Sequence, residues 1–131
     1  KKRAVASDMK DTMSSSWVIK AAGLTGAMAI GLGAFGAHGL KGRVDPTMIK
    51  VWETASHYHL ANAAALLAVG AGQAHMSKKA FKYSPPLLLA GTALFSGSLY
   101  MMVLTNKKAL GAITPIGGVL LIAGWAALAI P

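Results

Sequence analysis

Four ionisable side chains stand inside otherwise apolar stretches of the sequence. They are His38, near the end of the first stretch, and Glu53, His57 and His59, at the start of the second. Ionisable groups at membrane depth are costly and mark candidate functional residues. Glu53 and His57 are four residues apart, so on a helix the carboxylate can orient the imidazole. His59 lies about 200° around the helix from His57, so those two histidines cannot point at one ligand.

Three kinds of chemistry are open to these residues. A b-type haem or a metal ion could be held by His38 together with His57 or His59. A proton relay could run through Glu53 and the histidines. A quinone headgroup could form a hydrogen bond with one of them.

A structural role is the alternative, and it is the one we favour. Tyr58, His59 and Asn62 lie close together near the membrane surface and could cross-link helices, each hydrogen bond contributing about 0.6 kcal/mol. A weakly polar stripe in the third apolar stretch repeats every four residues and could receive them. Its members are Thr92, Ser96 and Tyr100.

Catalytic constellations are missing from the sequence. There is no cysteine, which excludes a thiolate nucleophile, an iron–sulfur cluster and a structural zinc finger. We find no Ser, His and Asp set, no glycine-rich nucleotide loop and no paired carboxylates. We therefore expect no enzymatic activity, no metal site and no cofactor.

The elements that must position these residues are membrane spans. The chain has 131 residues, of which 54% are hydrophobic and only 13% charged, about half the charge of an ordinary soluble domain. Apart from Glu53, no Asp, Glu, Lys or Arg occurs in residues 21–40, 51–77, 83–106 or 109–131. Each stretch is long enough to cross a bilayer, which takes about 20 residues of helix.

The expected fold is an all-α integral membrane protein, a four-transmembrane-helix bundle with short loops. A polar, basic N-terminal tail, residues 1–16, precedes the membrane domain, residues 17–131. The expected spans are residues 17–40, 47–74, 84–105 and 109–130.

Local signals set the boundaries of these spans. Asp45 can cap a helix that has Pro46 at its first position, and Ser84-Pro85-Pro86 predicts the start of the third span. A fourth helix starting at Pro115 would be about 24 Å long, shorter than the hydrocarbon layer of about 30 Å. We therefore expect a kinked helix starting near Ala109.

Small residues at helical spacing predict close helix packing, because lipid gives apolar helices no hydrophobic reason to associate. In the first span, Gly23, Ala27 and Gly31 form one such line, and Gly33 belongs to a second. The other small residues expected at helix contacts are Ala93, Gly97, Gly117 and Gly118.

The formal net charge of +9 comes from basic residues that flank the spans. A nucleic-acid binder needs such residues clustered on one soluble face, so we expect no nucleic-acid partner. Lysines at span ends meet anionic headgroups, and we expect a bound phospholipid such as cardiolipin near five of them. These are Lys78, Lys79, Lys82, Lys107 and Lys108.

Several runs of residues resemble one small membrane family. They are residues 33–39, Ala55 with Tyr58-His59, and residues 64–67, 91–100, 114–118 and 123–126. In this order they are similar to the transmembrane-protein-256-like family, also described as domain of unknown function 423, over about residues 20–130. The resemblance implies a four-helix membrane protein of bacterial envelopes and mitochondria.

One departure from the family pattern bears on ligand binding. Members of that family often have Gln after the Tyr and His three positions later, where this chain has His59 and Asn62. In this chain a histidine thus occupies the earlier of the two positions and an asparagine the later one. This difference argues against a fixed metal or haem ligand and fits a hydrogen-bonding role.

We predict a non-catalytic accessory subunit of a larger membrane complex, with other integral membrane subunits and lipids as partners. A mitochondrial inner-membrane respiratory-chain complex is the expected host, because the polar, basic N-terminal tail resembles what remains beside a mitochondrial targeting segment. One alternative is a small ion or solute transporter or channel with His38, Glu53 and His57 in its path. Another is a haem- or quinone-binding membrane protein.

Overall fold

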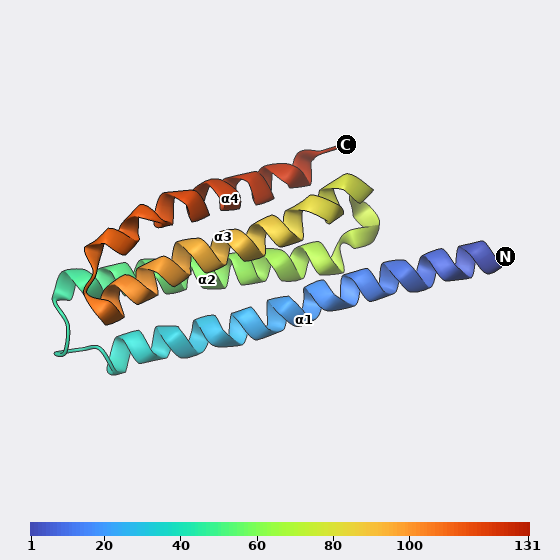
Figure 1. Cartoon of the computed structure of the whole chain (residues 1–131). Helices are drawn as coiled ribbons and strands as arrows, with labels where there is room; N and C mark the ends of the chain where they lie inside the picture. The colour runs from blue at the N-terminus through green and yellow to red at the C-terminus, as the bar shows by residue number, and fades with distance from the viewer.

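The computed structural model describes all 131 residues as four long helical columns joined by short turns (Figure 1). It contains no strand, so the all-α fold class is confirmed. The elements in chain order are α1 (Lys2–His38), α2 (Pro46–Ala71), the 3-10 turn η1 (Gln73–His75), α3 (Lys78–Thr105), the 3-10 turn η2 (Lys108–Ala112), α4 (Thr114–Ala126) and the 3-10 turn η3 (Ala127–Ala129).

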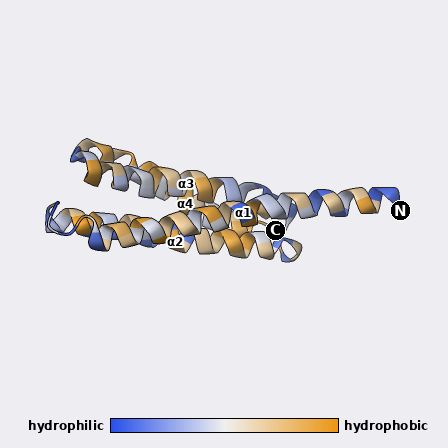
Figure 2. Cartoon of the chain, turned by 90° about the horizontal axis from the view of Figure 1, so that it is seen from below, coloured by the Kyte–Doolittle hydropathy of each residue, from blue (hydrophilic) through white to orange (hydrophobic).

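Consecutive helices run antiparallel and lie side by side. α1 packs along α2, α2 along α3 and α3 along α4, whereas α1 and α4 lie at opposite edges (Figure 1). The hydrophilic residues gather at the N-terminal end and at the turns, and hydrophobic residues run along the helices (Figure 2). This distribution is typical of a bundle whose long axis crosses a membrane.

Three helical segments are long and apolar enough to cross a membrane: α1, α3 and the stretch Lys108–Ala129. α2 has 26 residues but does not meet the same criterion of composition. Its first half carries exposed polar side chains, among them Lys50, Glu53 and His57. Of the four expected crossings, length and composition thus support three.

α1 is longer than the first expected span. Residues 1–16, expected as a tail, are helical from Lys2 onward and continuous with the apolar part of the helix. No Gly or Pro occurs before Gly23, so nothing in the sequence interrupts the helix. Residues 1–13 are all exposed, and this part of α1 projects beyond the other helices (Figures 1 and 2).

α3 begins at Lys78, before the expected start at Ser84. Ser77 provides the cap, because its hydroxyl oxygen accepts a hydrogen bond from the Ala80 N–H at 3.0 Å. Pro85 and Pro86 therefore lie inside the helix. The carbonyls that the prolines leave free are close to the helix end, where water or headgroups can bind them. The proline pair predicted a boundary, but the stronger capping signal lies upstream.

The last helical segment has two parts. It begins at Lys108, next to the expected Ala109, and changes from 3-10 to α-helix at Thr114-Pro115. The 13 residues of α4 would span only about 20 Å. Together with the 3-10 turns the segment reaches 22 residues, which is long enough to cross the hydrocarbon layer.

Asp45 caps α2 as the sequence predicts. Its Oδ1 accepts hydrogen bonds from the Thr47 N–H at 2.8 Å and from the Thr47 hydroxyl at 2.6 Å, and Pro46 occupies the first turn. The hydrogen bond from the Thr47 side chain, followed by that from its backbone, lowers the pKa of Asp45. A carboxyl group with a lowered pKa stabilises the fold above its ordinary pKa, and this contribution is lost as the pH falls through the lowered value.

Asp45→Ala is therefore expected to lower the thermal unfolding midpoint at pH 7, because α2 loses its cap. The difference from wild type should shrink as the pH falls below about 4, the ordinary pKa of Asp, because the unfolded chain then binds a proton that the folded carboxyl, with its lowered pKa, does not. Melting curves in detergent between pH 7 and pH 3 test this. Asp8→Ala, at an exposed position without a capping bond, is the control. A difference that stays constant across this range would contradict the prediction.

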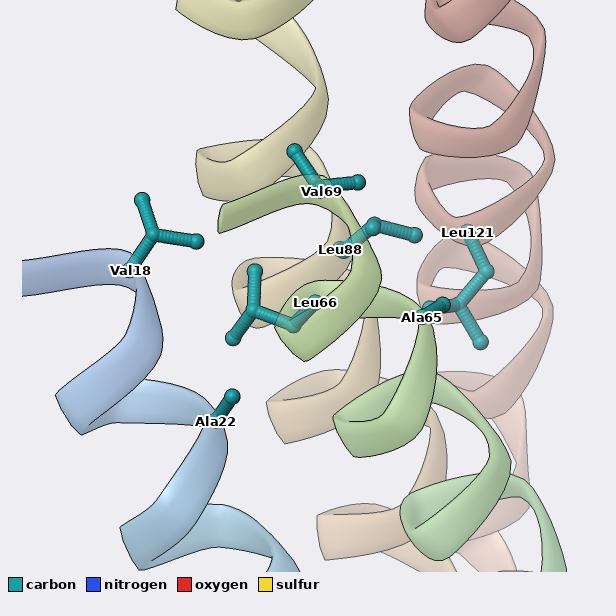
Figure 3. Close-up of a cluster of buried hydrophobic side chains, with 7 residues drawn as sticks. All are labelled: Val18, Ala22, Ala65, Leu66, Val69, Leu88 and Leu121. Carbon is teal, nitrogen blue, oxygen red and sulfur yellow. The ribbon is translucent and has the colours of Figure 1, made fainter. Parts of the chain in front are cut away.

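Two clusters of buried hydrophobic side chains hold the bundle together. The first draws on all four helices, with α1 and α2 side chains meeting and Leu88 and Leu121 closing the α3 and α4 side (Figure 3). The second surrounds Trp52 nearer the opposite end of the bundle. The first cluster contains Val18, Ala22, Ala65, Leu66, Val69, Leu88 and Leu121, and the second contains Leu40, Trp52, Ala55, Leu99, Tyr100 and Val103.

Candidate functional site

The polar residues at membrane depth divide into an inner and an outer group. His59 belongs to the inner group: its Nδ1 lies 3.0 Å from the Tyr100 hydroxyl, which joins α2 to α3. Both side chains are buried, and the Tyr100 ring packs on Trp52 with ring centroids 4.6 Å apart. His59 is thus a packed, hydrogen-bonded part of the core.

The hydroxyl groups of the α3 stripe act in different ways. Ser96 Oγ donates to the Ala55 carbonyl at 2.7 Å and links α3 to α2. Thr92 Oγ1 donates to the Leu88 carbonyl of its own helix at 2.7 Å. The sequence placed Thr92 and Ser96 on one stripe, but of their two hydroxyls only that of Ser96 forms a hydrogen bond to another helix.

Asn62 joins α2 to α4. Its Oδ1 accepts a hydrogen bond from Trp125 Nε1 at 3.0 Å, and its Nδ2 donates to the Tyr58 carbonyl at 2.8 Å. Both the oxygen and the nitrogen of the Asn62 amide therefore have a hydrogen-bond partner. Tyr58 itself is half exposed, and its ring packs against Phe95 of α3 with centroids 4.8 Å apart.

The bond between Asn62 and Trp125 should be measurable as a coupling energy. In a double-mutant cycle of Asn62→Leu and Trp125→Phe, we expect a coupling of about 0.6 to 1.7 kcal/mol, the range found for hydrogen bonds between membrane helices. The unfolding free energies come from SDS titration in mixed micelles. The control is a cycle of Asn62→Leu with Trp17→Phe. Trp17 lies on α1, and its indole forms no hydrogen bond with Asn62. Equal coupling in the two cycles would refute the interaction.

Sequence reasoning missed several interhelical hydrogen bonds. Trp52 Nε1 donates to the Leu32 carbonyl at 2.7 Å, between α2 and α1. The hydroxyls of Ser98 and Thr114 are 2.7 Å apart, between α3 and the start of α4. A Trp within an apolar stretch is the signal that could have indicated the first, because a buried indole N–H needs an acceptor.

The outer group consists of His38, Glu53 and His57, all of which are exposed. Glu53 and His57 lie on the side of α2 turned away from its buried residues, and the His57 ring meets Tyr58 edge-on at 5.9 Å. The structure therefore does not bring the four ionisable residues together. No group of three or more His, Cys, Asp or Glu residues is placed to hold a metal ion.

The small residues also divide into two groups. A Cβ on Gly117 would lie 2.7 Å from the Phe95 Cα, so α4 approaches the α3 backbone there. Cβ atoms on Gly33 and Gly118 would make ordinary van der Waals contacts with Ser56 and Phe95, at 3.8 and 3.7 Å.

The other small residues expected to pack face outward. A Cβ on Gly23, Gly31 or Gly97 would have no neighbouring atom within 4 Å, and Ala27 and Ala93 are exposed. They therefore make no close contact with another helix of this chain, and their role in helix packing stays a prediction. Their four-residue repeat puts them on one side of each helix, but in this fold the opposite side is packed. The close contacts come instead from Gly36, Gly70, Gly91, Gly117 and Gly124.

The five lysines expected at headgroups lie at the two ends of α3. Lys78, Lys79 and Lys82 are in its first turns, and Lys107 and Lys108 follow its last residue. All five are exposed. The 28 residues of α3 span about 42 Å, the thickness of a bilayer with its headgroups. Both sets are therefore at headgroup level when α3 crosses the membrane.

Comparison with known sequences identifies the family. Residues 32–118 match the family described as "Protein of unknown function (DUF423)". The chain belongs to the DUF423 family. The matched region includes the buried polar residues His59, Asn62 and Tyr100 of this DUF423 protein. No solved structure matches the chain.

Relatives of this DUF423 protein occur in bacteria and in a fungus. A UPF0382 membrane protein of Staphylococcus aureus is 48% identical over 107 residues, which cover 82% of this chain and 87% of the relative. One of Schizosaccharomyces pombe is 41% identical over 113 residues, covering 82% and 93%. YwdK of Bacillus subtilis is 43% identical over 103 residues, covering 75% and 80%. These names and the apolar helices establish an integral, multi-pass membrane protein.

The outward faces of this DUF423 protein differ from helix to helix. α4 presents bulky apolar side chains, including Val119 and Ile122, that are 64% and 71% exposed. α2 instead exposes polar residues in its first half and mainly small ones in its second, flanked by Leu60 and Leu67. The exposed polar and small residues of this α2 face are Lys50, Glu53, Thr54, His57, Ala61, Ala64 and Ala68.

Proposed function

We propose that this DUF423 protein is a non-catalytic structural subunit that packs against other integral membrane chains of a larger assembly. The observation that supports this most is the α2 face. Glu53 and His57 are exposed there, and hydrocarbon solvates such groups poorly. A second membrane chain that supplies hydrogen-bond partners would remove this cost.

The second half of the α2 face supports the same role. Ala61, Ala64 and Ala68 are exposed and lie on neighbouring turns, so another helix can approach the α2 backbone closely. The outward line of Gly23, Ala27 and Gly31 on α1 offers a similar surface. By contrast, the bulky outward side chains of α4 suit contact with acyl chains.

We propose that α2 also crosses the membrane, which gives the four crossings expected from the sequence. α2 packs along both α1 and α3, and these two helices are apolar enough to span. A helix held between two spanning helices shares their depth. The polar composition of α2 is then a feature of its outward face, which the partner covers.

The distribution of the relatives bears on which assembly hosts this protein. Relatives in Staphylococcus and Bacillus argue against a role confined to mitochondria. A respiratory-chain complex could host relatives from bacteria and from eukaryotes, because bacterial cytoplasmic membranes and the mitochondrial inner membrane both contain such complexes. We therefore propose an accessory role in such a complex, in the mitochondrial inner membrane where the cell is eukaryotic.

The test compares two alanines that are both exposed. Ala64→Leu adds bulk to the α2 face, and Ala126→Leu adds the same bulk to α4. After mild solubilisation, wild type and Ala126→Leu should migrate on native gels in an assembly larger than the monomer. Ala64→Leu should shift towards the monomer, because a leucine holds the partner helix away.

A photo-crosslinking amino acid at the same places gives an independent measurement. At position 64 it should yield a discrete adduct with an integral membrane protein, and at Ile122 it should yield only lipid adducts. A wild-type chain that migrates as a monomer and gives no protein adduct from position 64 would overturn the proposal.

The exposed position of Glu53 also offers an experiment that distinguishes a structural subunit from a transporter. A conduction path through Glu53, His57 and His38 would have to form between this chain and a neighbour, because all three are exposed. Flux in reconstituted vesicles that disappears with Glu53→Gln would indicate a transporter. A structural subunit shows no flux, either as wild type or as the Glu53→Gln variant.

A visible or redox-active group in the purified assembly, lost with His38→Ala or His57→Ala, would indicate haem or quinone binding.

A further inference from the structure

The α1 arm, residues 2–13, carries an apolar stripe that faces water. Val5, Met9 and Met13 are 54%, 62% and 71% exposed, and their four-residue spacing puts them on one side of the helix. Trp is enriched at the membrane surface, and Met9 lies about 12 Å further out than Trp17. α1 leaves the bundle as an unbroken helix along the bundle axis (Figures 1 and 2). The arm therefore does not lie on the membrane surface, where lipid would cover an apolar stripe.

The stripe also faces away from the rest of its own chain. Met9 precedes Ala27 by 18 residues, which is about five full turns, so the two lie on the same side of α1. Ala27 is nine residues, about two and a half turns, from each of the buried residues Val18 and Gly36, which therefore lie on the opposite side. Since α1 is at an edge of the bundle (Figure 1), only a separate molecule can cover the stripe.

Opposite charges flank the stripe. Asp8 and Lys10 adjoin Met9 in the sequence, so they project about 100° to either side of it. Arg3 precedes Lys10 by seven residues and lies on the same side as Lys10. All three charged side chains are exposed. One flank of the stripe is thus acidic at Asp8, and the other is basic.

We propose that the α1 arm pairs with the α1 arm of a second copy of this chain, in a parallel dimer with two-fold symmetry. The two-fold axis runs along the helices, so the acidic flank of each copy faces the basic flank of the other. An antiparallel pair would bring like flanks together. Two copies with the same orientation in the membrane present their arms in parallel, so the charge pattern favours self-association over a partner with a different sequence.

The dimensions of a helix pair suit this contact. With helix axes about 9 Å apart, the two Met9 Cα atoms are about 5 Å apart. Nearly parallel axes let the helices continue into the membrane, where Ala27 adds little bulk on the same side. Lys20 also lies on this side, but at headgroup level, where its long side chain can extend to lipid phosphates.

Pairing would remove two unfavourable features of the arm. It covers apolar side chains that are otherwise in water, and it supports a 12-residue segment that is marginally stable as an isolated helix. The contact uses α1 and leaves the α2 face free, so it does not depend on the partner proposed for that face.

Disulfide cross-linking in membrane vesicles tests the pairing, and the chain contains no cysteine that would interfere. Met9→Cys, oxidised with copper phenanthroline, should give a covalent dimer, because a disulfide bridges Cα atoms up to about 7 Å apart. Ser7→Cys is the matched control. Ser7 is also exposed on the arm but points about 160° away from Met9, so its Cα atoms in the dimer are about 13 Å apart. At the same protein-to-lipid ratio it should give little dimer.

Charge reversal in the Met9→Cys chain tests the flanks. Arg3→Glu with Lys10→Glu makes both flanks acidic, and Asp8→Lys makes both basic. Each variant should cross-link with itself about tenfold less than Met9→Cys alone, because attraction on both sides of the dimer becomes repulsion. Co-expression of the two variants should restore the dimer, which misfolded chains would not do.

Four results would overturn the proposal. They are the absence of any Met9→Cys dimer, equal dimer yields from Met9→Cys and Ser7→Cys, an adduct of Met9→Cys with another protein only, and charge-reversed variants that cross-link with themselves as well as with each other. Addition of Ala64→Leu, which disturbs the α2 face, should leave the Met9→Cys dimer intact. The two proposals can therefore fail separately.

Discussion

Gly117→Ala is expected to lower the free energy of unfolding by about 3 kcal/mol, at the upper end of the cost of overpacking a core. The added Cβ would lie 2.7 Å from the Phe95 Cα and 2.8 Å from the Leu94 carbonyl carbon. These are backbone atoms of α3, so no rotamer change can relieve the contact. α4 must move away along its whole packed face. SDS titration in mixed micelles measures the change.

Gly97→Ala is the matched control for this prediction. Gly97 lies inside α3, but a Cβ there would have no neighbouring atom within 4 Å. Alanine is a better helix former than glycine by up to about 1 kcal/mol, so Gly97→Ala should leave the free energy of unfolding unchanged or raise it slightly. If both alanine variants behave alike, the close approach of α4 to α3 at Gly117 is wrong.

Trp52→Ala is the second substitution with a large expected effect, a loss of about 3 to 5 kcal/mol. Trp52 is 1% exposed and connects three helices. Its Nε1 donates to the Leu32 carbonyl of α1 at 2.7 Å, its ring packs on Tyr100 of α3 with centroids 4.6 Å apart, and its edge fills the space that Gly36 leaves open. Alanine leaves a cavity where these helices meet.

Trp52→Phe separates the packing of the indole from its hydrogen bond. Phenylalanine keeps an aromatic ring but leaves the Leu32 carbonyl without its donor, which should cost about 1 kcal/mol. Trp17→Ala, at a tryptophan that is 45% exposed, should cost less than about 1 kcal/mol. The order Trp52→Ala, Trp52→Phe, Trp17→Ala in decreasing cost is the expected result. A Trp52→Ala variant as stable as Trp17→Ala would contradict the packing described.

Local signals in the sequence predicted part of this structure. The Asp45 cap with Pro46 behind it marked the start of α2 correctly, because capping involves residues close in the sequence. The sequence also predicted that His59 and Asn62 form hydrogen bonds between helices, and that the stripe of Thr92, Ser96 and Tyr100 could receive them. The partner of Asn62 was not predictable: Trp125 is on α4, and only the arrangement of the four helices brings it to α2.

The direction of the small-residue lines could not be predicted either. Spacing shows that Gly23, Ala27 and Gly31 share a face, but it does not show whether that face meets this chain, another chain or lipid. In a soluble protein, hydrophobicity would distinguish inside from outside. In a bilayer both surroundings are apolar, so this signal is lost, and inner glycines such as Gly36 and Gly124 resemble outer ones in sequence.

The unbroken helix of α1 makes its first residues sensitive to the membrane itself. The helix has 37 residues and is therefore about 55 Å long, and no proline interrupts it. Membrane helices tilt to fit the thickness of the bilayer, by about 20° on average. Because the outer third of α1 is a rigid arm about 20 Å long, such a tilt moves its tip sideways by about 7 Å. A thinner or thicker bilayer would thus change which molecules at the membrane surface the N-terminal end can reach.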